Sequence, residues 1–329
     1  MAGAFGFYKD LTNRYLATFG KDKAYLLPMA LDNAKYHNNT VTWGIAGYGQ
    51  VTLKEIWPGM SLTAGLRYDY EKSELNYRDS LLFSGQQQYT SYHDSKEDKG
   101  FKAWLPKFSL LQRWNDNLSL YLSVSKGYKA GGYNIIVNEM SSQVVDLRYD
   151  EEKLWNYELS FSQRLMDNRL SYGLNVFYIN GENLIIRLPN PNGSGMLNQN
   201  SGEIENWGAE ANVGYQFNPV WSVMANYSWL HMENPVLASP EHKLYGGVNF
   251  RKGRWSASTG IQYVKGLYTD LDAATKENFV LWDMQGSFKA TNYLSFYVRG
   301  ENLLAQRYEI NAGYPMPKAT FMGGVNINF

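Results

Sequence analysis

The side chains that could do chemistry in this chain are few and dispersed. Cysteine is absent, and four histidines occur, at His37, His93, His231 and His242. No serine, histidine and aspartate stand at a spacing that indicates a nucleophilic triad, which disfavours a hydrolase built into the fold. Acidic pairs such as Glu97-Asp98 and Glu151-Glu152 could hold calcium, but pairs in polar loops usually serve solvation. The sequence therefore predicts a protein that is not an enzyme and has no metal site and no cofactor.

The connections that must position these residues alternate between short and long along the whole chain. The short ones are tight turns at 55–59, 114–117, 166–169, 217–219, 251–254 and 290–292. The long ones are polar loops, including 21–39, 78–99, 133–150 and 188–200. Because an antiparallel meander has its turns on two opposite sides, this alternation places all short turns on one side. Short periplasmic turns and long external loops are typical of a bacterial outer-membrane β-barrel.

Composition agrees with a barrel in the bacterial cell outer membrane. The chain has 26 Tyr and 10 Trp, as expected where aromatic belts mark two membrane interfaces. Mean hydropathy is −0.44, and no apolar run approaches the ~18 residues of a membrane helix. The net charge is +0 without a Lys/Arg cluster, which argues against nucleic acid as a partner. The first residues lack a signal peptide, so we expect that one was removed or that the chain begins inside a longer one.

Each predicted strand alternates apolar residues with small or polar ones. Between Met60 and Glu71, for example, Leu62 and Leu66 interleave with Thr63 and Arg67. We interpret the apolar set as facing lipid and the polar set as lining a wet lumen; a soluble all-β protein is the disfavoured alternative. The predicted fold is an all-β transmembrane antiparallel meander of about 14 strands. The expected strands are 3–18, 41–54, 60–77, 100–114, 117–131, 152–166, 169–187, 200–217, 220–234, 241–251, 254–269, 278–290, 293–309 and 318–329.

The last predicted strand ends the chain on an aromatic residue, Phe329. We interpret it as the C-terminal strand that the barrel assembly machinery recognises. If Phe329 is periplasmic, the even number of strands makes every long loop external.

Four local motifs resemble the C-terminal half of a TonB-dependent outer-membrane receptor, in the order and spacing of that family. They are SLTAGLRYDYEK at 61–72, KGYKAGGYN at 126–134, NWGAE at 206–210 and GENLLAQRYE at 300–309. The family positions carried over are Gly127, Gly131, Gly132, Glu301, Asn302, Leu303 and Tyr308. The two adjacent glycines are expected to let the strand turn into its loop.

The resemblance implies a barrel of about 22 strands with a plug domain in its lumen. We therefore expect residues 1–329 to form a single β-barrel domain, equivalent to the last fourteen strands, with the plug and the first strands missing. TonB would act only through the missing N-terminal region. The first strand would leave an unpaired edge, which is untenable in lipid unless another strand covers it. Whether the fourteen strands close on themselves is open at this stage.

The resemblance also implies capture of a metal chelate, most often a ferric siderophore, at the external mouth. Aromatic and cationic groups suit chelates that are anionic and have flat faces. The candidates are Tyr89, Tyr92, Tyr128, Tyr133, Arg148, Arg187 and Trp229. For each of them, a role in an aromatic belt or in loop packing is the competing interpretation. The histidines lack the flanking motifs of haem receptors and are interpreted as solvated loop residues.

A complete fourteen-stranded passive channel for fatty acids or small solutes remains the alternative. The strand number favours the channel, whereas the motifs favour the receptor. The sequence does not specify whether a siderophore, haem, cobalamin or a glycan is carried, because the loops that determine specificity share little within the family.

Overall fold

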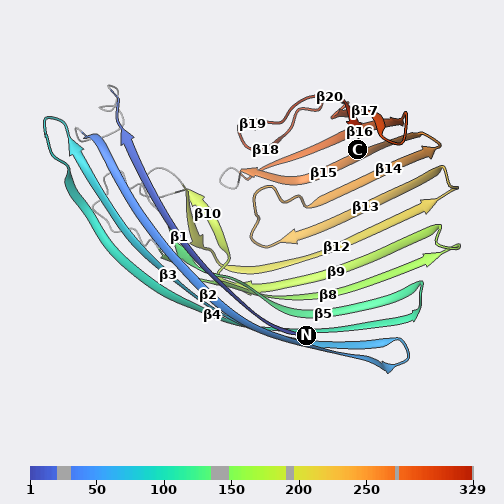
Figure 1. The fold of residues 1–329 in the computed structure, drawn as a ribbon, viewed down its shortest axis with the longest axis horizontal. Helices are drawn as coiled ribbons and strands as arrows, with labels where there is room; N and C mark the ends of the chain where they lie inside the picture. Colours follow the sequence, from blue (N-terminus) through green and yellow to red (C-terminus); the bar gives the residue numbers. More distant parts are fainter. Residues whose placement is uncertain (21–30, 135–147, 190–195, 271–273, 328–329) are drawn as a thin grey trace.

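A computed structural model describes residues 1–20, 31–134, 148–189, 196–270 and 274–327. Fourteen strands form one antiparallel sheet in which each strand pairs with its neighbours in sequence (Figure 1). These strands are β1 (Ala2–Thr18), β2 (Leu31–Trp57), β3 (Met60–Phe83), β4 (Thr90–Asn115), β5 (Leu118–Lys129), β8 (Glu152–Leu165), β9 (Leu170–Glu182), β12 (Glu203–Gln216), β13 (Trp221–Met232), β14 (His242–Lys252), β15 (Trp255–Asp270), β16 (Thr275–Lys289), β17 (Leu294–Glu301) and β20 (Thr320–Ile327). The predicted fourteen-stranded meander is confirmed. No helix in this described part of the chain has the length and apolar character needed to span a bilayer.

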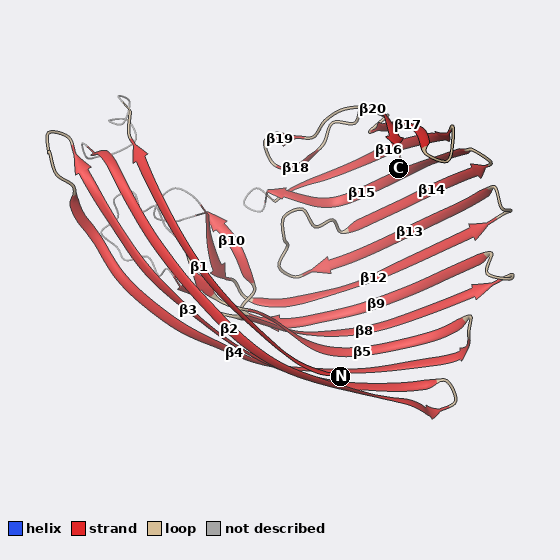
Figure 2. Ribbon diagram, viewed as in Figure 1, coloured by secondary structure: helices blue, strands red, loops and turns tan. Residues whose placement is uncertain are grey.

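The short turns lie together at one end of the sheet and the long loops at the other (Figure 2). Residues with positive φ allow the tight reversals, as at Gly59 with φ 74°. A Cβ at Gly59 would lie 1.8 Å from the carbonyl oxygen of Arg113, so only glycine fits there. The predicted alternation of connections is therefore confirmed.

Three of the strands are much longer than the sequence suggested. β2, β3 and β4 have 27, 24 and 26 residues, and much of the predicted loops 21–39 and 78–99 belongs to them. At about 3.3 Å per residue they extend some tens of ångströms beyond the ~30 Å hydrocarbon layer. The prediction was wrong here because a strand that leaves the membrane meets water on its outer face and no longer shows a simple apolar alternation.

Two predicted strands end earlier than expected. β9 stops at Glu182 because Asn183 has a φ of 59°, and β17 stops at Glu301 because Asn302 has a φ of 48°. Such residues leave the extended conformation. Beyond these points the chain forms short hairpins within the long loops. They are β6 (Gly132–Tyr133) with β7 (Arg148–Tyr149), β10 (Ile185–Pro189) with β11 (Met196–Asn200), and β18 (Glu309–Asn311) with β19 (Tyr314–Pro315).

The two faces of the sheet separate apolar from polar residues as predicted. Five leucines form one row across β2, β3, β4, β5 and β8, at Leu53, Leu62, Leu110, Leu122 and Leu159. The adjacent row on the other face is Thr52, Thr63, Ser109, Ser123 and Glu158. Leu53 is 57% exposed, which suits a face covered by hydrocarbon. The polar face lines the lumen.

An aromatic belt crosses the lipid face near the long-loop end. Trp155, Tyr157, Tyr178, Trp207 and His231 follow one another across four strands, with ring centroids 6.5, 6.1, 6.5 and 4.7 Å apart. A second set of exposed tryptophans lies near the short turns, at Trp57, Trp114, Trp221 and Trp255. These two sets mark the two membrane interfaces. His231 was expected in a loop, but it stacks on Trp207 in the belt.

The sheet curls but has two edges. Within the described residues β1 pairs only with β2, and β20 pairs only with β17. Figure 1 shows these two strands at the two ends of the curled sheet. The expectation that the first strand leaves an unpaired edge is therefore met.

Candidate functional site

The external mouth is shaped by a split between β4 and β5. The β4–β5 ladder ends at Lys107↔Ser125, although β4 continues along β3 and β5 continues along β8. Tyr128, near the end of β5, lies within electrostatic range of Asp69 and Glu71 on the lumen face of β3. β5 therefore leaves the wall and leads its loop over the lumen face of the long strands.

Glycines in the GYKAGGYN motif are required for close packing at this split. A Cβ on Gly131 would lie 2.4 Å from the Tyr149 carbonyl oxygen and 2.6 Å from the ring of Phe101, a β4 residue that is 1% exposed. A Cβ on Gly132 would lie 2.7 Å from the Tyr149 hydroxyl. β5 ends at Lys129, just before the pair, and neither glycine has a positive φ. The close approach of other atoms is what favours glycine at these positions. Gly127 is less constrained, because its Cβ would lie 2.8 Å from the end of the Leu154 side chain, which can move.

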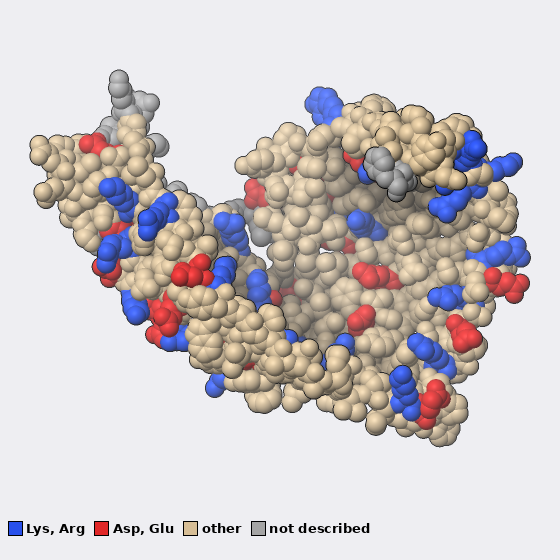
Figure 3. Space-filling view, in the orientation of Figure 1, with Lys and Arg blue, Asp and Glu red and all other residues tan. Residues whose placement is uncertain are grey.

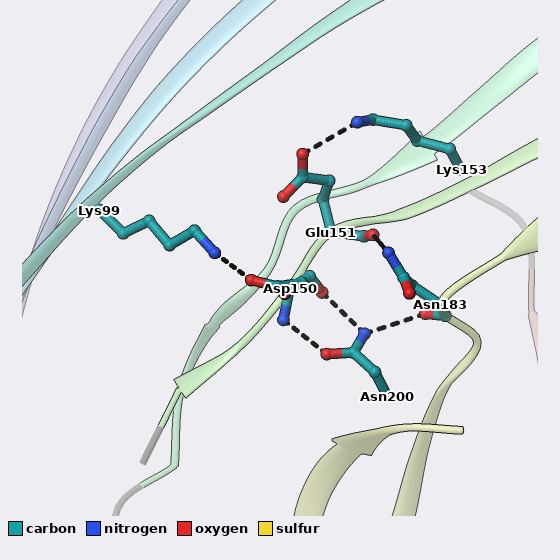
Figure 4. Close-up of polar contacts among 6 residues, drawn as sticks. All are labelled: Lys99, Asp150, Glu151, Lys153, Asn183 and Asn200. Atoms are coloured by element: carbon teal, nitrogen blue, oxygen red, sulfur yellow. Dashed lines mark hydrogen bonds and ion pairs between the residues drawn. The ribbon is translucent and has the colours of Figure 1, made fainter. Parts of the chain in front are cut away.

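Asn200 joins two loops of the mouth through three hydrogen bonds (Figure 4). Its Oδ1 accepts from the Asp150 amide at 2.6 Å. Its Nδ2 donates to the carbonyl oxygens of Asp150 and Asn183, both at 3.0 Å. The Lys99 ammonium pairs with the Asp150 carboxylate, so the same loop is also tied to β4. Asn200 thus couples the end of the β5–β8 loop to the β9–β12 loop.

A second asparagine makes a similar connection. Asn134 Nδ2 donates to the Asn198 carbonyl at 2.8 Å, and its Oδ1 accepts from the Asn198 amide at 2.7 Å. Asn134 is 7% exposed. Because both its amide atoms are used, the start of the β5–β8 loop is fixed against β11.

Two tyrosines of the motif place their hydroxyls in buried surroundings. The hydroxyls of Tyr128 and Tyr133 are buried, and neither makes a hydrogen bond to a described residue. Burial raises the pKa of Tyr133 to about 12, and the negative charges of Glu97 and Asp98 add to this effect. Burial likewise raises the pKa of Tyr128 well above its ordinary value. Both hydroxyls therefore stay protonated at neutral pH.

The carboxylate of Glu151 is held in its charged form. Burial alone would raise its pKa, but a hydrogen bond from Lys153 Nζ at 2.9 Å and the charge of Lys99 outweigh burial. The pKa of Glu151 is therefore lowered. Its backbone carbonyl accepts from Asn183 Nδ2 at 3.4 Å, so this acid also belongs to the joined loops (Figure 4).

The predicted cations lie in the short hairpins of the mouth. Arg148 in β7 is exposed and stands opposite Tyr133 of β6. Arg187 in β10 is exposed and stands opposite Asn198 of β11. The structure brings these two hairpins together through Asn134 and Asn198.

The remaining predicted candidates lie elsewhere. The ring of Tyr89 lies 3.8 Å from Lys35 Nζ at the far end of the long strands. Trp229 is in register with Ala209 and His242 on the lipid face, which is the position of a belt residue. The Tyr92 side chain and Phe329 lie outside the described residues.

The ENLLAQRY segment forms a tight structure at the top of β17. Asn302 is 5% exposed, and its backbone amide donates to Asp283 at 2.8 Å. Its side chain bonds Gln306 and Pro317. The amide of Leu303 donates to the Trp282 carbonyl at 2.8 Å. Two further family positions lie beside it, since Glu301 pairs with Arg299 at 2.5 Å and Tyr308 packs on Phe279 at 4.2 Å. The family positions Glu301, Asn302, Leu303 and Tyr308 thus make structural contacts with the barrel strands.

The residues that join the loops were largely missed by sequence reasoning. Asn134 belongs to a recognised motif, but nothing in the sequence around Asn183 or Asn200 distinguishes them from solvated loop residues. Their partners are distant in sequence, so only the fold reveals them. Within the described residues, no group of three or more His, Asp or Glu side chains is placed to hold a metal ion.

Comparison with known proteins gives a consistent result. The family model described as "TonB dependent receptor-like, beta-barrel" matches residues 2–303. The pesticin receptor of Yersinia enterocolitica is 24% identical over 322 residues, which are 92% of this chain and 44% of that protein. The pesticin receptor of Yersinia pestis is also 24% identical, over 326 residues. The chain thus spans less than half the length of these curated relatives.

Solved structures share the fold. The ferric yersiniabactin uptake receptor FyuA from Yersinia pestis has a TM-score of 0.69 at 18% identity, covering 100% of this chain and 55% of that one. The open form of the ferric-catecholate import receptor Fiu from E. coli K12 has a TM-score of 0.68 at 17% identity, covering 100% of this chain and 49% of that one.

Proposed function

The chain belongs to the TonB-dependent receptor β-barrels of the bacterial outer membrane, and on this premise we propose that it forms the wall and external mouth of a ferric-siderophore receptor. Its relatives include a ferric yersiniabactin uptake receptor and a ferric-catecholate import receptor. Members of this family are receptors and transporters rather than enzymes. The cargo is bound and passed through the membrane, and no bond in it is made or broken.

The proposal rests mainly on one observation: the β5–β8 and β9–β12 loops are hydrogen-bonded to each other at the external end of a polar lumen. Asn134 and Asn200 fix two loops that hold Arg148 and Arg187. Fixed cations lose little entropy when they bind an anionic chelate, which favours high affinity for a scarce ligand. Tyr133 adds an aromatic residue opposite Arg148.

We assign distinct roles to the remaining parts of the transport system. Residues 1–329 are proposed as one β-barrel domain, with a plug and further strands supplied by the rest of a longer protein. TonB would act through that additional region. Lipid covers the apolar face, and the barrel assembly machinery would recognise the last strand.

A passive fourteen-stranded channel is less well supported. Such a channel needs its first and last strands to pair, since unpaired backbone groups are costly in hydrocarbon. Among the described residues no ladder joins β1 to β20. This observation favours the receptor over the channel.

Growth on single iron sources tests the proposal. A strain lacking the gene is expected to lose growth on one ferric siderophore and to regain it with the intact gene. Arg148→Ser with Arg187→Ser is expected to reduce uptake of the labelled chelate, because the two exposed arginines of the mouth hairpins are lost. Arg164→Ser with Arg169→Ser also removes two arginines, at the short-turn end, and serves as the control. If cobalamin or a glycan, rather than any iron source, depended on the gene, the siderophore assignment would be wrong.

A further inference from the structure

The lipid face is hollowed over β2 to β5, on the hydrocarbon side of the aromatic belt. A groove of about 410 Å³ is lined there mainly by apolar side chains, among them Val51, Leu62, Phe108 and Leu122. The register explains the hollow. The small side chain of Ala64 stands between Val51 on β2 and Phe108 on β4, two residues along from the leucine row and therefore on the same face. The groove thus opens toward hydrocarbon.

Two lysines lie on this face where the groove approaches the belt. Lys126 follows Val124 by two residues on β5, and its ammonium lies 5.7 Å from the centre of the Trp155 ring. On β4, Lys102 is exposed and stands opposite Tyr70, an aromatic residue of the same face. Because lysine has a long apolar stem, a lysine at this depth can carry its charge to the polar headgroups of the membrane.

The groove reaches the point where the wall divides. The β4–β5 ladder stops just before Pro106 on β4, which has no amide hydrogen to continue it, and just before Lys126 on β5. The ladder pair Phe108↔Val124 lies just inside this point and borders the groove. Lys126 therefore stands at the external end of the groove, where the two strands separate.

The rest of a complete barrel would leave this surface facing lipid. A plug would lie in the lumen, and further strands would extend the sheet at its edges, whereas the groove lies on the outer side of the wall. Two carboxylates of this face lie farther from the membrane, since Glu74 and Asp98 pair with Lys72 at 3.0 Å, outward of Tyr70. Figure 3 shows charged side chains of both signs over the extensions of the long strands and again at the short turns, with a mainly uncharged band between them.

We propose that the lipid face at the β4–β5 split binds a lipid with a phosphate headgroup, which places its phosphate beside Lys126 and an acyl chain in the groove. Ammonium groups form strong hydrogen bonds with phosphate oxygens, and lysines at a membrane surface attract anionic lipids. Lys102 adds a second positive charge to the headgroup region. Because the long loops are external, this lipid belongs to the outer leaflet. A free anion would not use the groove, and a lipid without net charge would not use the lysines.

Native mass spectrometry tests the headgroup contact. The protein, expressed as its gene encodes it and purified in detergent, is titrated with phosphatidic acid and with phosphatidylcholine, whose choline group offsets the phosphate charge. Phosphatidic acid is expected to bind more tightly. Lys102→Gln with Lys126→Gln is expected to raise its Kd about ten-fold or more, because two positive charges beside the headgroup are lost. Lys107→Gln with Lys129→Gln removes two lysines from the other face of the same strands and is expected to leave the Kd unchanged.

A second substitution tests the groove without changing any charge. Ala64→Leu is expected to fill the hollow between Val51 and Phe108 and to raise the Kd for phosphatidic acid several-fold. Ala211→Leu makes the same change at an exposed position of the lipid face on β12 and is the matched control. Its Kd is expected to equal that of the wild type.

Three results would overturn the proposal. The first is an equal Kd for the two lysine double variants, or for the two alanine variants. The second is equal binding of phosphatidic acid and phosphatidylcholine, which would assign the groove to acyl chains without a role for the lysines. The third is displacement of phosphatidic acid by an equal concentration of inorganic phosphate, which would indicate a site for a free anion. None of these results depends on iron uptake, so the lipid site and the receptor function are tested separately.

Discussion

Above the aromatic belt, β2, β3 and β4 continue as paired strands, whereas β5, β8 and β9 end and give way to loops. The β2–β3 ladder is unbroken from Asn33↔Leu82 to Lys54↔Ser61. The β5–β8 ladder ends at Lys129↔Glu152, and beyond it the loops are joined by asparagine side chains. Backbone pairing uses groups that every residue except proline possesses, so the long strands tolerate changes in sequence. The joined loops depend on particular side chains and are the part that a single substitution can disrupt.

Of the substitutions that separate the joined loops from the long strands, Gly131→Ala should have the largest effect. The added methyl group would meet the Tyr149 carbonyl and the Phe101 ring, and overpacking of this kind costs about 1–3 kcal/mol. The loop is expected to move, and uptake of the labelled chelate should fall at least about ten-fold. Gly47→Ala in β2 is the matched control, because no described residue other than its chain neighbours has an atom within 4 Å of the added Cβ. Equal loss of uptake in both variants would show that the mouth has no special packing requirement.

Asn200→Ala should have the next largest effect. It removes three hydrogen bonds, and at about 1 kcal/mol for each the loops should open more often. Hydrogen exchange followed by mass spectrometry should show faster exchange in β7, β10 and β11. Asn39→Ala in β2 also loses two side-chain bonds, to Asp10 and Thr12, but leaves the ladder intact. If Asn39→Ala raised exchange in β2 more than Asn200→Ala raised it in the loops, the long strands would be the region that depends on single side chains.

The same contrast explains what the sequence could predict. The strands within the membrane were predicted because lipid on one side and water on the other impose an alternation, as in the leucine row through Leu62 and Leu110. Outside the membrane this constraint disappears, so the full length of the extensions of β2, β3 and β4 was missed. The roles of Asn183 and Asn200 could not be predicted, because they depend on which loops the fold brings together. Trp229 was predicted as a ligand-binding residue but lies on the lipid face. The sequence does not show which side of the wall an aromatic residue at the rim faces.

Lys99→Met should have a smaller effect, since it breaks the ion pair with Asp150 that connects the two regions. The Lys99 and Asp150 side chains are 25% and 54% exposed, so the loss should stay below about 1 kcal/mol. The loss should disappear in high salt, where the wild-type pair is screened. Protease cleavage within the β5–β8 loop, measured at low and high salt, gives the readout. Arg78→Met breaks an exposed pair within the long strands and should leave cleavage unchanged. Cleavage that rises equally at both salt concentrations would point to lost packing instead.

Acidification should produce the smallest effect, and only in the joined loops. The folded pKa of Glu151 is lowered, mainly because Lys153 outweighs the effect of burial. The unfolded loop therefore takes up a proton first as the pH falls, and the stabilisation from Glu151 is present above its ordinary pKa of about 4.5 and lost below it. Hydrogen exchange between about pH 6 and about pH 3, corrected for intrinsic rates, should show β8 loosening near Glu151 while the β2–β3 ladder stays protected. Glu151→Gln should remove this pH dependence, because the amide does not titrate. If β8 in that variant still loosened on acidification, another group would be responsible, and the charge on Glu151 would not be what holds the loop.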